Sequence, residues 1–254
     1  MLLLIDAGNT RVKWALVDAS LSDQPGKWDA AGSVSHAELP SVQAIWAHAA
    51  IGRVLIANVA GTALRQALQE VLNTVLEPHV PVEWFASSAE RAGVRNRYRN
   101  PAQLGCDRFA AAIGARAMRP DESLIVATCG TATTIDAVSA DGVFVGGMIL
   151  PGIALMTASL AQHTAQLPQV ALQTHAQPFA DHTDAAIVSG CLMAQTGAIE
   201  RAVTALRNET RAENVTCILA GGAADLIAPQ LSIPFERIDN LVLIGLQTVA
   251  TSSC

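Results

Sequence analysis

Blocks of apolar residues along the chain are separated by short polar segments, and the first block predicts a β-hairpin. Residues 2–5 form a short apolar run that is typical of a buried strand. Between residues 11 and 17 the side chains alternate, which places Val12, Trp14 and Leu16 on one face. Because the turn joining the two strands is so short, the strands must be antiparallel.

Strands and helices alternate through the rest of the chain, which predicts an α/β fold with mixed sheets flanked by helices. The predicted strands are 33–36, 53–59, 82–86, 124–128, 133–139, 142–145 and 215–220. The predicted helices are 39–50, 62–76 (with Thr62 as its cap), 107–118, 152–160, 183–208 and 240–250. Segments 21–32, 87–103 and 161–182 are predicted as irregular connections.

The strand-turn-strand pattern of the first hairpin is repeated near the middle of the chain. Residues 124–139 again form a strand, a Gly-Thr turn and a second strand. This repeat predicts a duplicated design, with one domain at 1–118 and a second at 119–254. We expect the two hairpins to hold a polyphosphate from two sides.

Composition narrows the class of protein. Of the 254 residues, 51% are hydrophobic and 15% are charged, which is enough apolar material for a packed core. The net charge of −6, with basic residues clustered only at 91–99, argues against general nucleic-acid binding. The apolar stretch 143–156 contains glycines and a proline and is too short to span a membrane. We therefore expect a soluble, cytoplasmic protein.

The cysteines show no paired spacing. No C-x-x-C motif is present, so reduced thiols are expected in preference to disulfides or a zinc site. The five cysteines are Cys106, Cys129, Cys191, Cys217 and Cys254.

The first turn has the chemistry of a phosphate-binding loop. Gly8 allows the backbone to approach a ligand closely, and Asn9 and Thr10 can hydrogen-bond an anion. Asp6 precedes this turn, and a carboxylate beside a phosphate is favourable when a hard cation such as Mg²⁺ lies between them. The ammonium group of Lys13 can reach the same anion. The alternative interpretation is an ordinary hairpin with a solvated lysine.

An Asp-Arg pair follows a glycine at the predicted start of the helix 107–118. A helix N-terminus stabilises anions, so an ionised Asp107 and a bound carboxylate would both be favoured there. Asp107 could accept a hydroxyl proton, and Arg108 could bind an acidic substrate group. The alternative is that Asp107 only caps the helix and Arg108 lies on the surface.

Four motifs in this order resemble those of the type III pantothenate kinases. They are Asp6-Ala-Gly-Asn-Thr10, Leu104-Gly-Cys-Asp-Arg108, Gly130-Thr-Ala-Thr-Thr-Ile-Asp136 and Gly146-Gly-Met-Ile-Leu-Pro-Gly152. The resemblance covers most of the chain. It implies two ribonuclease-H-like (actin-like ATPase) domains of the acetate and sugar kinase, heat-shock-70 and actin superfamily. It also implies phosphorylation of pantothenate by ATP, the first step of coenzyme A biosynthesis.

The resemblance assigns roles position by position. It implies Asp107 as the catalytic base and Asp6 as the residue that binds the metal ion. The residues implied to bind ATP are Asp6, Ala7, Gly8, Asn9, Thr10, Arg11, Val12, Lys13 and Thr131. The residues implied to bind pantothenate are Tyr98, Gly105, Cys106, Asp107, Arg108 and, across a homodimer interface, Thr183.

One position departs from the family pattern. Many members have an aspartate that helps to hold an activating K⁺ or NH₄⁺ ion, whereas this chain has Thr128, so the cation is held more weakly, held differently or not needed. Asp136 is interpreted equally well as a functional residue or as a partner of local turn donors. Gly146, Gly147 and Gly152 are expected to permit close backbone packing, and Gly221-Gly222 to let the adenosine approach.

Two rival functions stay open at this point. The first is a nucleotide-binding accessory factor of gene regulation without catalysis, against which the presence of both Asp6 and Asp107 argues. The second is a kinase of another small hydroxy acid. The motifs also leave the choice of nucleoside triphosphate open.

Overall fold

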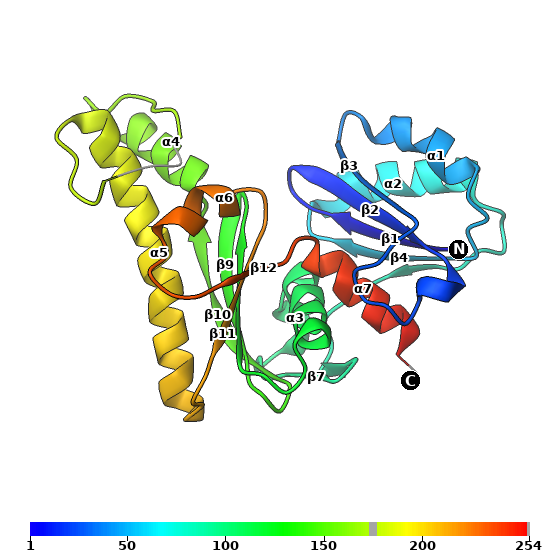
Figure 1. Cartoon of the computed structure of the whole chain (residues 1–254). Coiled ribbons are helices and arrows are strands. Elements are labelled where there is room, and N and C mark those ends of the chain that lie inside the picture. Colours follow the sequence, from blue (N-terminus) through cyan, green and yellow to red (C-terminus); the bar gives the residue numbers. More distant parts are fainter. Residues whose placement is uncertain (173–176, 253–254) are drawn as a thin grey trace. The chain divides into compact units, whose positions relative to one another are not determined.

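The computed structural model describes residues 1–172 and 177–252 (Figure 1). Residues 173–176 of the predicted irregular connection, and Cys254 with its predicted free thiol, lie outside the described residues. The chain divides into two compact units. Unit 1 comprises residues 1–120 together with the segment that begins at Asn240, and unit 2 comprises residues 121–239.

The sheet of unit 1 has the strand order β3-β2-β1-β4-β5. Strand β1 pairs with β2, and β2 with β3, in antiparallel fashion, whereas β1-β4 and β4-β5 are parallel pairs. The strands are β1 (Leu2–Ala7), β2 (Arg11–Val17), β3 (Ala30–Ser35), β4 (Arg53–Asn58) and β5 (Val82–Trp84). Strands β6 (Glu90–Arg91) and β7 (Val94–Asn96) are not part of this five-stranded sheet and pair with each other in antiparallel fashion.

Helices cover both faces of this sheet. On one face, apolar side chains of β1 and β2 pack against α1 and α2 around Trp46, Leu68 and Leu72. On the other face α3 and α7 contact the strands (Figure 1). The helices are α1 (Gln43–Ala47), α2 (Gly61–Val75), α3 (Cys106–Met118) and α7 (Leu241–Thr251), and short 3₁₀ helices are Ala19–Leu21, Leu39–Val42 and Pro101–Gln103.

Two glycines allow α3 and α7 to pack backbone against backbone. A Cβ atom on Gly245 would lie 1.8 Å from the carbonyl oxygen of Ala110. A Cβ atom on Gly114 would lie 2.3 Å from the carbonyl oxygen of Leu241. This contact joins the last helix to unit 1, although the sequence placed residues 240–254 with the second half of the chain.

Unit 2 repeats the strand order of unit 1. Its strands follow the order β10-β9-β8-β11-β12, with antiparallel pairs at β8-β9 and β9-β10 and parallel pairs at β8-β11 and β11-β12. The strands are β8 (Leu124–Cys129), β9 (Ala132–Val138), β10 (Val143–Pro151), β11 (Thr216–Ala220) and β12 (Glu236–Arg237). The predicted class, an α/β fold with mixed sheets flanked by helices, is confirmed.

The long helix of unit 2 provides most of the apolar cover for its sheet. Side chains such as Leu192, Ile199 and Val203 pack on Ile125 and Leu219. The helices of this unit are α4 (Ile153–His163), α5 (Thr183–Thr210) and α6 (Ala224–Ile227), followed by the 3₁₀ helix Ala228–Gln230.

Several local predictions were wrong in detail. The cap of α2 is Ala60 and makes no side-chain hydrogen bond, so Thr62 is not the cap. Strand β3 begins at Ala30, inside the predicted loop, because it pairs with β2 up to Leu16. The predicted connection 87–103 contains β6, β7 and a 3₁₀ helix. Such short elements lack a periodic apolar pattern.

Candidate functional site

Strand alternation in the first hairpin places Asp6 and Lys13 opposite one another. Leu3, Ile5 and Ala7 point into the core beneath α1 and α2, so Asp6 points to the other face of the sheet. In the antiparallel register Asp6 pairs with Lys13. Both side chains therefore lie on the face that α3 and α7 contact.

Asp6 is a carboxylate in an environment that disfavours its charge. Burial raises its pKa from 3.8 to about 7, although the positive charge of Lys13 lowers it. The negative charge of Asp107 raises the pKa further. The two carboxylates predicted as metal ligand and base are thus close enough to interact, and a cation beside Asp6 would favour its ionised form.

The turn after Asp6 is closed by its backbone. The Gly8 amide donates to the Arg11 carbonyl at 3.1 Å, and a ring nitrogen of His36 lies 2.9 Å from the Gly8 carbonyl oxygen. Arg11 reaches across to β3, where its Nε donates to the hydroxyl of Ser33 at 2.8 Å. Asn9 and Thr10 are exposed. The side chains of Ala7 and Val12 are fully buried, so only their backbones can meet a ligand.

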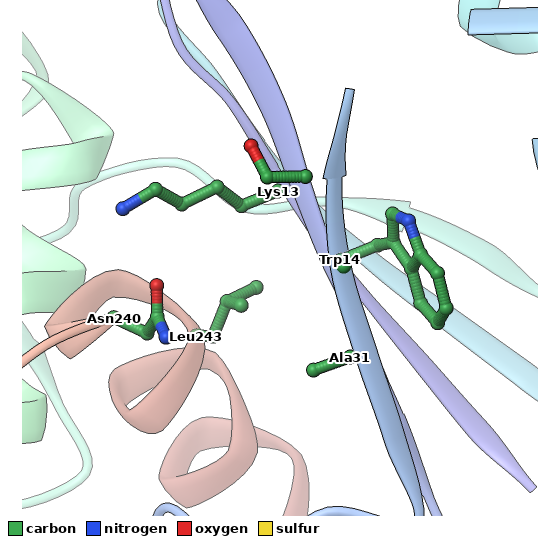
Figure 2. Close-up of a pocket in the computed structure, with 7 residues that line it drawn as sticks. Lys13, Trp14, Ala31, Asn240 and Leu243 are labelled. Atoms are coloured by element: carbon green, nitrogen blue, oxygen red, sulfur yellow. The ribbon is translucent and has the colours of Figure 1, made fainter.

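Lys13 borders open space. A cavity of about 260 Å³ lies between the strands and the start of α7. Figure 2 shows Lys13, Asn240 and Leu243 on one side of the strands and the Trp14 ring on the other side. The residues that line the cavity are Lys13, Trp14, Ala31, Gly32, Ser33, Asn240 and Leu243. The face that carries Asp6 and Lys13 therefore has room for a ligand beside the ammonium group.

The catalytic candidate Asp107 is the second residue of α3. Burial raises its pKa, while the Arg108 backbone N–H, which donates to Oδ1 at 2.8 Å, and the Arg108 charge lower it. A Cβ atom on Gly105 would lie 2.7 Å from the same Oδ1, so a side chain there would displace the carboxylate. The Cys106 thiol donates to the Asn58 carbonyl at 3.6 Å, which ties the helix start to β4.

Arg108 is a buried cation with an aromatic partner. It is only 7% exposed, and its Nη1 donates to the hydroxyl of Tyr98 at 3.1 Å. Its guanidinium carbon lies 5.9 Å from the centre of the Tyr98 ring. Asp107 is not the cap of α3, which is Gly105, and Arg108 is not a surface residue. The structure therefore contradicts the alternative interpretation of this pair.

Two asparagines were missed by the sequence analysis. The side-chain oxygen of Asn96 accepts from the Tyr98 amide at 3.1 Å, and that of Asn58 accepts from the Ala60 amide at 3.0 Å. Both arrangements are Asx turns, in which the side chain binds the backbone two residues later. The available signal was an asparagine two residues before Tyr98.

In unit 2 the Cys129–Thr131 turn is surrounded by glycines. The Gly152 amide donates to the Thr131 carbonyl at 2.9 Å, and a Cβ atom on Gly152 would lie 2.1 Å from the Gly130 carbonyl oxygen. A Cβ atom on Gly221, whose φ is +92°, would lie 2.3 Å from the Cys129 carbonyl oxygen. The predicted packing role of Gly152 is confirmed, and Gly221 has a packing role as well.

The other predicted residues of unit 2 lie in strands or at a helix start. Thr128 sits in β8 between Thr134 and Ala220 of the neighbouring strands. Asp136 is 1% exposed and lies within β9. Thr183 is exposed and is the first residue of α5.

The possible metal ligands near Asp6 suit a magnesium ion that binds together with a nucleotide. Within residues 1–172 and 177–252, no group of three or more His, Cys, Asp or Glu side chains could hold a metal ion. Mg²⁺ is usually bound by one or two carboxylates plus substrate phosphates and water, and not by a complete protein cage. Asp6 can supply one such carboxylate, and a bound cation would offset the effect of burial, which favours the protonated form.

Two further observations concern the predicted class of protein. The four described cysteines, Cys106, Cys129, Cys191 and Cys217, are free thiols, as predicted. Among the described helices, none has the length and apolar character needed to cross a membrane.

Comparison with known sequences gives a consistent result. Residues 2–205 match the family model described as type III pantothenate kinase. A type III pantothenate kinase of Janthinobacterium sp. (strain Marseille) is 65% identical over 253 residues, covering 98% of this chain and 97% of that protein. The type III pantothenate kinase of Herminiimonas arsenicoxydans is 62% identical with the same coverage.

Solved structures resemble this chain in fold. A conserved Campylobacter jejuni protein, provisionally assigned to the Baf family of transcriptional activators, has a TM-score of 0.59 at 18% identity, covering 97% of this chain and 96% of that one. A Sinorhizobium meliloti protein provisionally assigned as a 2-dehydro-3-deoxygalactonokinase has a TM-score of 0.58 at 16% identity, covering 98% of each chain. At these identities the likeness concerns the fold alone.

Proposed function

This chain belongs to the type III pantothenate kinases, and from that premise we propose how its residues carry out the ATP-dependent phosphorylation of pantothenate to 4′-phosphopantothenate, the first step of coenzyme A biosynthesis. The observation that carries the assignment is 65% identity over 98% of the chain. The reaction is a direct in-line transfer of the γ-phosphoryl group, in which positioning and electrostatics supply most of the catalysis.

On the acceptor side, Asp107 takes the proton of the pantothenate hydroxyl as the oxygen attacks phosphorus. A carboxylate whose pKa is raised by burial is a stronger base than a solvated one. Arg108 binds the pantothenate carboxylate, and Tyr98 packs against the substrate and holds the guanidinium through its hydroxyl. Gly105 and Cys106 line the pocket. The observation that supports these roles is the grouping of these side chains at the start of α3.

On the donor side, the Gly8–Thr10 turn and Lys13 bind the ATP phosphates, with the backbones of Ala7 and Val12 and the side chain of Arg11 framing the turn. Thr131 is a further residue that we assign to phosphate binding. Asp6 holds Mg²⁺, which neutralises charge on the phosphates when it is bound. The carboxylate of Asp6 and the ammonium of Lys13, paired across the hairpin, support this assignment.

The remaining assignments concern the assembly and its ions. We propose a cytoplasmic homodimer in which Thr183 reaches the pantothenate site of the partner subunit. Activation by K⁺ or NH₄⁺ is weakened because Thr128 stands where many family members have an aspartate. A neutral hydroxyl binds a monovalent cation less strongly than a carboxylate does.

The decisive experiment is a coupled assay of ADP release and phosphopantothenate formation by the purified protein with Mg²⁺. Pantothenate is present or omitted, and K⁺ and NH₄⁺ are compared with Na⁺. We expect pantothenate-dependent product, and with Asp107→Asn a turnover roughly 10²- to 10⁴-fold lower with ATP binding retained. Product formation at the normal rate by that variant would disprove the role of Asp107. No product from the wild type under any cation would disprove the proposed function.

A further inference from the structure

The side chain of Asn96 binds both ends of the loop that carries Tyr98. The Asn96 oxygen accepts from the Tyr98 amide at 3.1 Å. Its amide nitrogen donates to the carbonyls of Pro101 and Ser88, at 3.1 and 3.2 Å. Asn96 therefore ties both ends of the segment 98–101 to the neighbouring chain. Its two N–H donors and its carbonyl acceptor are all engaged.

The hydroxyl of Tyr98 contacts Arg108, which is proposed to bind the substrate carboxylate. The hydroxyl accepts from Arg108 at 3.1 Å, and the ring lies beside the guanidinium. A buried guanidinium needs fixed partners, because an unsatisfied charged donor is strongly destabilising. A displacement of the Tyr98 backbone therefore moves the hydroxyl and with it the orientation of Arg108.

We propose that Asn96 is a positioning residue for the acceptor site, acting through Tyr98 on Arg108. The proposal rests on the proposed function, because its kinetic consequence is the affinity for pantothenate. Asn96 sets the backbone position of Tyr98 through an Asx turn, and Tyr98 sets the guanidinium that meets the substrate carboxylate. ATP binding relies on other residues and is unaffected.

The chain offers a matched control on the same loop. The side-chain oxygen of Asn100 accepts from the Ala102 amide at 3.2 Å, which is also an Asx turn. This bond does not involve Tyr98 or the Pro101 carbonyl. Asn100→Ala therefore removes a similar hydrogen bond from the same loop without releasing Tyr98.

The test compares Asn96→Ala, Asn96→Ser and Asn100→Ala in steady-state kinetics. Asn96→Ala should raise the KM for pantothenate by about tenfold, the effect of losing roughly 1.4 kcal/mol of binding, with the KM for ATP within about twofold of wild type. A serine hydroxyl can still accept from the Tyr98 amide, so the KM for pantothenate of Asn96→Ser should lie between those of wild type and Asn96→Ala. Asn100→Ala should change neither KM by more than about twofold.

A double-mutant cycle separates positioning from general destabilisation. Tyr98→Phe removes the hydroxyl that Arg108 contacts, so adding Asn96→Ala to that variant should have a smaller effect on the KM for pantothenate than in wild type. An equal effect in both backgrounds would overturn the proposal. An unchanged KM in Asn96→Ala would do so as well.

A measurement independent of activity keeps the two hypotheses apart. Hydrogen exchange of the peptide segment 97–104 should be faster in Asn96→Ala than in wild type. If the wild type formed no phosphopantothenate, the proposed function would fall, and unchanged exchange in this segment would overturn the positioning role of Asn96 in its own right.

Discussion

Removing the charge of Asp6 should change the pH dependence of stability in a defined direction. The pKa of this carboxyl is 3.8 ordinarily and about 7 in the folded chain, chiefly because of burial. Between those values the folded state holds a proton that the unfolded state has lost. The stability that this group contributes is present below about pH 4 and is lost as the pH rises through about 7.

The magnitude follows from the same two values. Each pKa unit corresponds to about 1.4 kcal/mol, so the rise from 3.8 to about 7 corresponds to about 4 kcal/mol in the free energy of unfolding. Asp6→Asn keeps the shape of the side chain and cannot ionise. Its stability relative to wild type should therefore increase by about 4 kcal/mol from pH 4 to pH 8.

The tryptophans make the assay specific for unit 1. All four of them, Trp14, Trp28, Trp46 and Trp84, belong to that unit. Urea unfolding followed by tryptophan fluorescence, with EDTA and without nucleotide, therefore reports on the unit that contains Asp6. The difference between Asp6→Asn and wild type is taken at each pH, which cancels the titration of all groups common to both.

The carboxylate of Asp18 provides a control of opposite sign. The Ser20 amide donates to Asp18 at 3.0 Å and lowers its pKa. Because the folded state lowers this pKa, ionised Asp18 stabilises the wild type above its unfolded pKa, and this stabilisation is lost as the pH falls. Asp18→Asn lacks this contribution, so its stability relative to wild type should decrease as the pH rises. If the Asp6→Asn difference stayed constant between pH 4 and pH 8, Asp6 would not be a carboxylate with a raised pKa, and the argument for a cation beside it would fail.

Two further predictions concern residues outside the catalytic group. Arg237 donates to the Gly221 carbonyl at 3.2 Å and pairs with Asp239 at 2.9 Å. Arg237→Ala should release the turn that packs on Cys129, and should therefore raise the KM for ATP by about tenfold while leaving the KM for pantothenate unchanged. An unaltered KM for ATP would refute this prediction. Gln247 is fully buried, accepts from the Gly26 amide and the Trp28 ring nitrogen, and donates to the carbonyls of Leu21 and Gln24. Gln247→Leu leaves these partners without a hydrogen bond, so it should lower the free energy of unfolding, measured by urea titration, by about 3 kcal/mol or more. A loss below about 1 kcal/mol would contradict this prediction.

The elements that the sequence predicted well are those fixed by neighbouring residues. The hairpin and the face shared by Val12, Trp14 and Leu16 follow from one tight turn and strict alternation, so both could be predicted from fewer than twenty residues. The structure adds the register that pairs Asp6 with Lys13. The repeated strand-turn-strand pattern likewise predicted the duplicated architecture. These features need no knowledge of contacts between distant segments.

The features that the sequence did not reveal depend on such contacts. From the Asp-Arg pair alone Arg108 resembles a surface residue, because a charged side chain is rarely buried, and its hydrogen bond to Tyr98 appears only in the structure. Asn96 reads as one polar residue in an arginine-rich connection. Its importance lies in reaching Ser88 and Pro101, which are not its neighbours in the chain.

The final helix shows why a linear division of the chain fails. Its apolar residues predict a helix but not the sheet on which it packs, because apolar burial is non-directional. What selects unit 1 is steric: Gly245 meets the Ala110 carbonyl and Gly114 meets the Leu241 carbonyl, so each helix supplies a glycine where the other's backbone approaches. A larger residue at either position would force the helices apart. The two glycines belong to segments more than a hundred residues apart, and only their joint position in the fold places the last helix behind the sheet that carries Asp6.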